Sequence, residues 1–420
     1  MQTSQKGINV VGYTEGMFGL GEAVRLNIKA AQKHEIPLNL INYDKIKNSK
    51  NYRYSLEYPI NLVQISLNDL ESFFGFIDPY FFKQRYTILF MVWESEYIAP
   101  ELAENLNLFN EIWTTSKYCK TIFQKTFPNP IKIVPHPVEV DIQRVLNKKK
   151  IGYIDKTKFS FLFIFSYHSS IERKNPFFLI ESFKKAFGDR DDVELVIKTV
   201  GASKHKKSRQ RLQQCLSNNI KIYDVELDKD SVNQLIQSCD AYVSMHHSEG
   251  FGLTLAEAMY LGKPVIATNY SGNTEFMNDD NSFLVDYELG YIENSDTTFC
   301  PKTLWGNPLL DDAVEKLRSV YENSEVREKK AANASLFVKD ALSFFTIGST
   351  IKKRVDYLYA NLDVIVASQN QFTFILNKLQ TTKAENQNLK REIHRMKKNV
   401  IIRFMLMLKD GVRKMKSKRI

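Results

Sequence analysis

The apolar residues of the first 145 positions gather in short runs, and longer amphipathic segments separate these runs. Several runs are apolar at nearly every position, which is typical of parallel strands buried on both faces. The segments between them, such as residues 21–34 and 117–127, space their apolar residues as a helix does. This alternation predicts a doubly wound α/β domain. Its predicted strands are residues 8–13, 38–42, 60–66, 87–94, 111–116 and 131–136.

A second alternating series follows a segment with two prolines and a lysine run, residues 135–157, which we interpret as a linker. Helical patterns between residues 308 and 360 close this series. We therefore expect two Rossmann-like domains, 1–145 and 146–345, a closing helix at 346–362 that crosses back to the first domain, and a tail at 363–420. Ligands bind such sheets beyond the C-terminal ends of their strands. The predicted elements of the second series are strands 159–167, 193–200, 219–225, 240–246, 264–269 and 282–286 and helices 175–187 and 253–262.

The composition, with 43% hydrophobic and 25% charged residues, is that of a globular protein. The four cysteines are far apart, which argues against a disulfide framework or a metal knuckle and fits a reducing cytosol. The first residues lack a basic start followed by an apolar run, so we expect no signal peptide. The longest apolar stretches are too short to span a bilayer.

The net charge of +10 belongs to one end of the chain. Residues 361–420 hold 14 Lys and Arg against 4 Asp and Glu, whereas residues 1–360 hold 44 of each sign. A nucleic-acid enzyme usually carries its basic patch on the folded body. The charge therefore predicts a surface partner for the tail and no nucleic-acid substrate.

One loop of the second domain combines glycines with a carboxylate at a predicted helix start. Glu249 precedes Gly250-Phe251-Gly252, and Leu253 begins the helix. Glycine lets main-chain N–H groups approach a ligand, and a helix N-terminus carries roughly half a positive charge. The loop predicts a pyrophosphate site, and Glu257, inside the helix, offers a second carboxylate for ligand hydroxyls. A plain helix start with a solvated glutamate is the alternative.

The segment Ser-Glu-Gly-Phe-Gly-Leu-Thr-Leu-Ala-Glu, residues 248–257, resembles the motif of two spaced glutamates in retaining GT-B glycosyltransferases of family four. The resemblance runs from residue 8 to about residue 360, and it implies two Rossmann-like domains facing a cleft. It also implies that Glu249 contacts hydroxyls of the donor sugar and that Glu257 contacts the ribose. The amides around Phe251-Gly252-Leu253 would meet the sugar and the diphosphate.

Two basic residues, Arg173 and Lys174, stand directly before the predicted helix at 175–187. Cations there can reach a phosphate and stabilise a leaving nucleoside diphosphate. The resemblance implies an Arg and a Lys for the diphosphate, in place of a metal ion. The family's Arg usually stands further before the Lys, where Ser169 lies here, so Lys198 at the end of the next strand competes with Arg173 for that role.

The segment between the first strand and the first helix contains Gly16, Gly19 and Gly21. Their order differs from that of the dinucleotide fingerprint. The segment is similar to a glycine loop in one branch of the same transferases, which implies that Gly19 and Gly21 face the cleft near the transferred group. A plain strand–helix turn is the alternative.

Trp93, Glu94 and Glu96 end a predicted strand and should face the cleft, where the resemblance implies a wall for the acceptor. Glu94 would position the acceptor or accept its proton, and no protein nucleophile is required. His246, directly before the donor loop, would either touch the sugar or have a structural role. His136 is expected to shape the hinge.

The tail has two patterns. Its first half places apolar and polar residues at alternating spacings of four and three, which fits both a short coiled-coil dimer and a lone amphipathic helix. Its last part, residues 396–420, is basic with an apolar stripe, which fits an anionic membrane surface or a solvated tail. The seam residues are Ile375, Leu379, Thr382, Asn386, Leu389, Ile393, Met396 and Val400.

The expected function is retaining transfer of a hexose from a GDP- or UDP-sugar, with mannose preferred by analogy. The expected acceptor is a glycan or a polyprenyl-linked glycan in surface polysaccharide (lipopolysaccharide or capsule) biosynthesis. We expect no metal or other cofactor and a location at the cytoplasmic face of the membrane. The alternatives are an epimerase or phosphorylase on the same fold and a non-catalytic coiled-coil scaffold.

Overall fold

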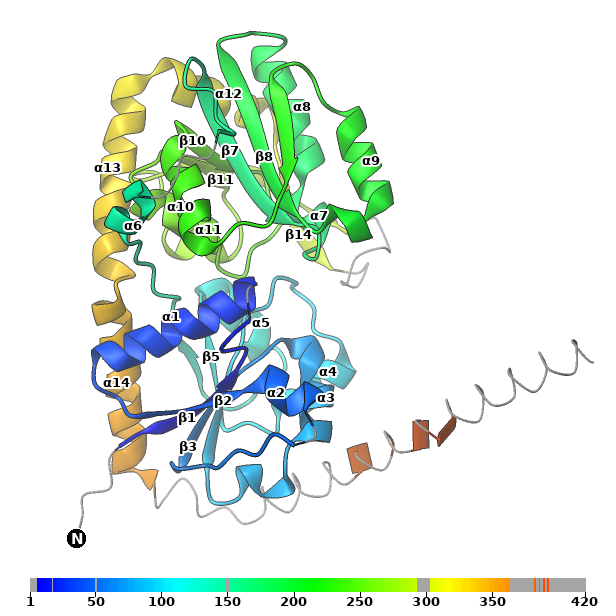
Figure 1. Cartoon of the computed structure of the whole chain (residues 1–420), viewed down its shortest axis with the longest axis vertical. Coiled ribbons are helices and arrows are strands. Elements are labelled where there is room, and N and C mark those ends of the chain that lie inside the picture. The colour runs from blue at the N-terminus through cyan, green and yellow to red at the C-terminus, as the bar shows by residue number, and fades with distance from the viewer. Residues whose placement is uncertain are drawn as a thin grey trace, which may run out of the picture.

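The computed structural model describes residues 6–16, 18–49, 51–147, 152–292 and 303–362, together with a few residues between 381 and 392. Two six-stranded parallel sheets lie one above the other, each covered by helices (Figure 1). This confirms the predicted fold of two Rossmann-like domains. The coiled-coil and membrane predictions concern a tail that lies almost entirely outside the described residues.

The first sheet has the order β2-β1-β3-β4-β5-β6. β1 and β4 are buried at every position, as their continuous apolar sequences predict. Its strands are β1 (Ile8–Gly12), β2 (Leu38–Asn42), β3 (Ile60–Gln64), β4 (Tyr86–Phe90), β5 (Glu111–Thr114) and β6 (Ile131–Ile133). Its helices are α1 (Gly19–Lys33), α2 (Tyr43–Asn48), α3 (Leu70–Phe76), α4 (Pro100–Leu106) and α5 (Lys117–Gln124).

The second sheet has the order β12-β11-β10-β7-β8-β9. Its strands are β7 (Phe159–Ser166), β8 (Val193–Val200), β9 (Ile220–Asp224), β10 (Ala241–Ser244), β11 (Val265–Thr268) and β12 (Phe283–Val285). Its helices, with α6 in the linker, are α6 (Ile142–Asn147), α7 (Ile171–Lys174), α8 (Pro176–Phe187), α9 (Lys206–Gln214), α10 (Lys229–Ser238), α11 (Leu253–Tyr260) and α12 (Leu310–Glu322). α8 and α12 pack on one face of the sheet, and α10 and α11 pack on the other.

The strand order reverses between β7 and β10, which are neighbours in the second sheet although they are distant in sequence. A crevice forms at such a switch point, because the loops that follow the two strands turn to opposite faces of the sheet. The loop after β7 leads to Arg173 and Lys174, and the loop after β10 carries Glu249. The topology therefore brings the two predicted parts of the donor site together.

Two long helices, α13 (Ser324–Ala341) and α14 (Phe344–Ala360), run along one side of both domains (Figure 1). α14 packs against α1 so closely that a Cβ on Gly348 would lie 2.2 Å from the carbonyl oxygen of Ala30. Arg354 of α14 also pairs with the fully buried Glu111 of β5. The closing helix is thus anchored in the first domain.

A two-stranded antiparallel hairpin was not expected from the sequence. It consists of β13 (Tyr287–Tyr291) and β14 (Leu304–Pro308), which follow β12 and precede α12 along the chain. Across the described residues, no helix is both long and apolar enough to cross a bilayer.

Candidate functional site

The loop between β10 and α11 is held in one conformation by its own main chain and by the turn at Ser271-Gly272. Gly252 has φ +92°, a left-handed conformation that favours glycine, and Leu253 begins α11 immediately afterwards. The Glu249 N–H donates to Ser271 Oγ over 2.7 Å, and the Gly272 N–H donates to the Glu249 carbonyl oxygen over 2.7 Å. The loop is therefore a rigid mount for the Glu249 side chain.

Glu249 lies between the two predicted cations. Its Oε2 is 3.2 Å from Arg173 Nη1, and its Oε1 pairs with Lys174 Nζ. Arg173 also donates to the Ser248 carbonyl oxygen over 2.8 Å and lies 3.6 Å from Glu94 Oε1 of the other domain. All four charges converge, although Glu94 and Glu249 are 155 positions apart in the sequence.

Burial and charge act in opposite directions on this cluster. Burial alone would raise the pKa of Glu249, but the nearby Lys174 and Arg173 lower it to about 2. Burial lowers the pKa of Lys174 against the opposing effect of Glu249. Burial also disfavours the charged form of Arg173, but Glu94 and Glu249 outweigh it and raise the pKa. At neutral pH the cluster holds an ionised carboxylate and at least one firmly charged cation, which suits a polyhydroxylated, anionic ligand.

Glu257 lies in α11 with 2% of its surface exposed. One oxygen pairs with Lys229 at the start of α10, and the other, Oε2, is buried without a hydrogen-bond partner among the described residues. Burial raises the pKa of Glu257, and Lys229 opposes the shift. Lys229 was not singled out from the sequence, because nothing local marks a lysine whose partner is 28 positions away.

His246 is fully buried, and both of its ring nitrogens are used within the protein. Nε2 lies 3.0 Å from Asn273 Oδ1, and Nδ1 lies 3.1 Å from Ser244 Oγ. Because Asn273 Oδ1 only accepts, Nε2 carries the proton and the Ser244 hydroxyl donates to Nδ1. Burial lowers the pKa of His246 to about 4. This geometry supports the structural alternative for His246.

The remaining predicted residues lie in different settings. Lys198 of β8 is buried, and burial lowers its pKa while Asp224 and Glu226 act against the shift. The Phe251 ring packs against His136 and Phe276, at ring centroid distances of 5.3 and 5.0 Å. Its side chain is therefore used in packing, and only its main chain is available to a ligand.

Gly19 and Gly21 lie in the first turn of α1, not in a loop. Gly19 is open on its Cα side, whereas a Cβ on Gly21 would lie 2.2 Å from the Gly16 carbonyl oxygen. Gly21 is thus required by the local chain path, and Gly19 is left free to face a ligand.

The first domain touches the donor loop directly. Ser248 Oγ donates to the Glu94 carbonyl oxygen over 2.6 Å, and Thr115 Oγ1 donates to the Gly250 carbonyl oxygen over 2.9 Å. A Cβ on Gly250 would lie 2.0 Å from Val92 Cγ1. The acceptor wall predicted at residues 93–96 therefore adjoins the donor loop.

The unexpected hairpin supports the same loop from its other side. Trp305 of β14 stacks on His247 with the ring centroids 4.2 Å apart, and the Gly306 N–H donates to the His247 carbonyl oxygen over 3.0 Å. The His247 N–H in turn donates to the Arg173 carbonyl oxygen over 2.9 Å. The hairpin thus fixes the main chain on both sides of the Arg173–Glu249 pair.

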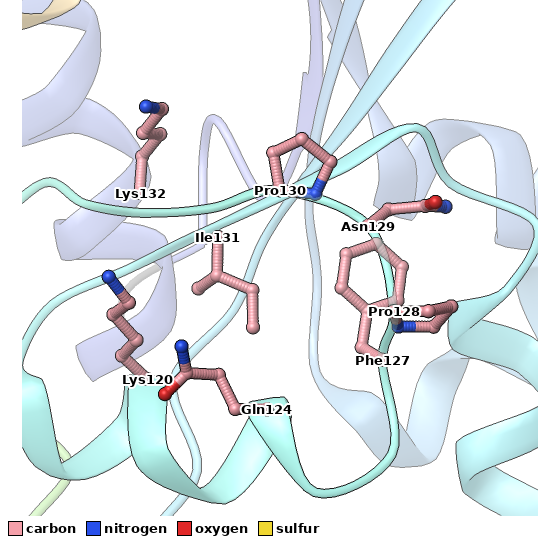
Figure 2. A pocket seen from close by; sticks show the side chains of 8 residues that line it. All are labelled: Lys120, Gln124, Phe127, Pro128, Asn129, Pro130, Ile131 and Lys132. Atoms are coloured by element: carbon pink, nitrogen blue, oxygen red, sulfur yellow. The ribbon is translucent and has the colours of Figure 1, made fainter.

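A surface hollow of the first domain is not part of this site. Figure 2 shows that side chains of α5, of the turn after it and of the start of β6 line the hollow. The donor loop instead contacts Thr115, which follows the last residue of β5. Within the described ranges, no three His, Cys, Asp or Glu residues are grouped as a metal site would require. The hollow is lined by Lys120, Gln124, Phe127, Pro128, Asn129, Pro130, Ile131 and Lys132.

Residues 150–289, which include both glutamates, Arg173 and Lys174, match the family model of glycosyl transferases group 1. Over these residues the chain is similar to that family. The matched part covers the second sheet and its donor loop, and the hairpin lies almost wholly beyond it.

Two curated relatives match this chain over part of their length. The GDP-Man:Man(3)GlcNAc(2)-PP-Dol alpha-1,2-mannosyltransferase of Dictyostelium discoideum is 24% identical over 60% of this chain and 49% of its own. An uncharacterized glycosyltransferase of Methanocaldococcus jannaschii is 32% identical over 34% of this chain and 35% of its own. The chain thus spans about half the length of these relatives or less.

Among solved structures, HepE of Anabaena in complex with UDP and glucose has a TM-score of 0.59. It is 16% identical to this chain, and the match covers 84% of this chain and all of that one. This likeness supports the GT-B fold of the chain.

Proposed function

We propose that this protein is a glycosyltransferase that moves a hexose from a nucleoside-diphosphate sugar to a glycan or lipid-linked acceptor, with retention of configuration. The observation that carries the proposal is the buried Glu249 carboxylate between Arg173 and Lys174, at a helix start beside the switch point of the second sheet. A carboxylate there accepts hydrogen bonds from sugar hydroxyls, and the two cations face the site of a departing diphosphate.

In this proposal the donor replaces interactions that the protein makes with itself. Arg173 and Lys174 are neutralised by Glu94 and Glu249, so an incoming diphosphate would share or take over their positive charge. Glu249, with its pKa of about 2, stays ionised at neutral pH and accepts hydrogen bonds from the sugar's hydroxyls. The main chain at Gly252 and Leu253 would face the phosphates at the N-terminus of α11.

Glu94 belongs to the first domain, yet its carboxylate lies 3.6 Å from Arg173. In the proposed reaction it would orient the acceptor hydroxyl beside the departing phosphate, which would itself assist deprotonation. No protein nucleophile and no metal ion enter the proposal, because Arg173 and Lys174 would supply the charge stabilisation.

GDP-mannose is the preferred donor, because a curated relative is named as a mannosyltransferase that uses GDP-Man. UDP-glucose is the next donor to test, because a protein of the same fold is known in complex with UDP and glucose. For the acceptor we propose a polyprenyl-linked or free glycan of a surface polysaccharide, reached at the cytoplasmic face of a membrane through the basic tail.

The proposal is tested by release of nucleoside diphosphate from a panel of nucleotide sugars, with and without glycan acceptors. Glu249→Ala should lower acceptor-dependent turnover by roughly a hundredfold or more, because it removes an interaction with the reacting sugar. Glu249→Gln should act in the same direction with less disturbance of packing, and thermal denaturation checks that each variant folds.

Glu288→Ala, which changes an exposed carboxylate of β13, is the matched control and should turn over normally. Normal turnover by both Glu249 variants would contradict the assigned role. Absence of binding to every nucleotide sugar would contradict the activity itself.

A further inference from the structure

Lys229 and Glu257 form an ion pair between α10 and α11 of the second domain. Glu257 lies in the middle of α11, and Lys229 is the first residue of α10. Both helices pack on the same face of the second sheet. The Glu257 side chain is 3% exposed and the Lys229 side chain 37% exposed, so the lysine reaches inward from the surface to a buried carboxylate.

The pair leaves half of the carboxylate unused. Lys229 contacts Oε1, whereas Oε2 is buried and has no hydrogen-bond partner among the residues that the structure describes. A buried carboxylate oxygen without a hydrogen-bond donor costs free energy, and a ligand hydroxyl that donates to it would remove that cost. Glu22 of α1 lies near enough for its negative charge to raise the pKa of Glu257 further, so α1 does not stabilise the Glu257 carboxylate.

We propose that Lys229 is a positioning residue that orients Glu257 so that its free oxygen accepts a hydroxyl of the nucleotide's ribose. This inference rests on the proposed function and on the ribose contact that the family resemblance implies for Glu257. The lysine touches one oxygen only, and it therefore determines which way the other oxygen points. Oε2 is buried in this structure, so a ribose hydroxyl reaches it only when the side chains that cover it move aside on binding.

The same domain offers a matched control pair. Lys221 of β9 pairs over 2.6 Å with Glu194, whose side chain is fully buried, and the Lys221 side chain is 35% exposed. Glu194 Oε1, however, accepts the Asp155 N–H over 2.7 Å, so both of its oxygens are occupied. Removing either lysine leaves a buried glutamate without its cation, but only Lys229 adjoins the proposed nucleotide site.

The experiment measures affinities for GDP and UDP and for their 2′,3′-dideoxy analogues by calorimetry. For whichever base binds, the wild-type protein should prefer the ribonucleotide by roughly tenfold or more, as a hydrogen bond to a charged group implies. Glu257→Gln and Lys229→Met should both lose most of this preference. Lys221→Met should keep it, even where thermal denaturation shows the same loss of stability.

Lys229→Gln, which keeps a hydrogen-bond donor but removes the charge, is a milder second variant with the same expected direction. A Lys229 variant that folds and retains the full ribose preference would overturn the proposal. So would a Glu257→Gln protein with unchanged preference. If neither nucleotide binds the wild-type protein, the proposed function fails together with this inference, whereas a Lys229 variant that still binds the nucleotide but has lost the ribose preference supports both.

Discussion

Gly250 lies where the two domains come closest, and its lack of a side chain is what allows the contact. An alanine Cβ would lie 2.0 Å from Val92 Cγ1, so either the loop or the first domain must move. Because small displacements of reacting groups are costly, Gly250→Ala should lower turnover by up to about a hundredfold. Val92→Ala in the same protein should restore part of it. Turnover assays on both, with Gly152→Ala as a control at an open position, test this.

Wild-type activity in Gly250→Ala, or no recovery in the double variant, would contradict the close contact between the domains.

The role of a single residue could be predicted where its chemical type and its place after a predicted strand both indicate a binding site. Glu249, Arg173 and Lys174 follow two strands that meet at the switch point, and the structure brings their side chains together. Lys229 escaped prediction, because an ion pair between distant residues leaves no local pattern. His246 could be placed beside the loop, but its two hydrogen bonds depend on Ser244 and on the distant Asn273.

Among the elements, α14 is held to the first domain by its packing on α1 and by one buried ion pair. Arg354 binds Glu111, whose side chain is fully buried and also accepts from Tyr86 and Trp113. Arg354→Met should lower the free energy of unfolding by about 3–5 kcal/mol, because it leaves a buried carboxylate without its cation. Urea denaturation followed by circular dichroism measures the change.

The matched control is Lys352→Met in the same helix. Lys352 pairs with Asp356 at the surface, and such a pair contributes about 1 kcal/mol or less. Equal effects of the two substitutions would contradict the role given to Glu111. The double variant of Arg354→Met with Glu111→Gln should be more stable than Arg354→Met alone.

Most strands were predictable, because many of them are runs of mainly apolar residues buried in a sheet. Their ends were less predictable: the strand expected at 131–136 stops at Ile133, shortly before Pro135, which has no N–H to donate. The hairpin of β13 and β14 was missed, because its first strand is largely exposed and has no apolar run. Its importance lies in contacts with His247, which the local sequence does not reveal.

For the whole molecule, three buried histidines predict that stability depends on pH. Burial lowers the pKa of His136 to about 3 and of His246 and His247 to about 4, from an ordinary 6.5. The unfolded chain therefore binds more protons than the folded one between about pH 4 and 6.5. Stability is complete above that range and falls as the pH decreases through it, by about 1 kcal/mol per histidine at pH 5.5.

Urea denaturation at pH 7.5 and 5.5 measures this change. His136→Phe should show a smaller pH dependence, because it removes one buried imidazole from between Phe90 and Phe251 and keeps an aromatic ring there. Equal stability of the wild-type protein at the two pH values would contradict the burial of these rings.

The net positive charge of the whole molecule comes from its tail, because the other 360 residues have equal numbers of basic and acidic side chains. Deleting residues 397–420 should weaken binding to phosphatidylglycerol vesicles, because each basic residue near an anionic surface contributes about 1 kcal/mol. Turnover with a soluble acceptor should not change. Vesicle sedimentation, with phosphatidylcholine vesicles as the control, measures the effect, and undiminished binding would contradict the membrane role.

The contact between the domains also constrains how such enzymes can be recombined. Thr115 donates to a main-chain carbonyl at Gly250, and Ser248 donates to a main-chain carbonyl at Glu94, so these two bonds do not depend on which side chains the acceptors carry. The contact of Val92 is different, because its side chain packs against the Cα of Gly250, which carries no side chain. A foreign first domain grafted onto this second domain would need a hydroxyl at position 115 and a side chain no larger than valine at position 92. Those two positions form a simple compatibility rule for building hybrid enzymes.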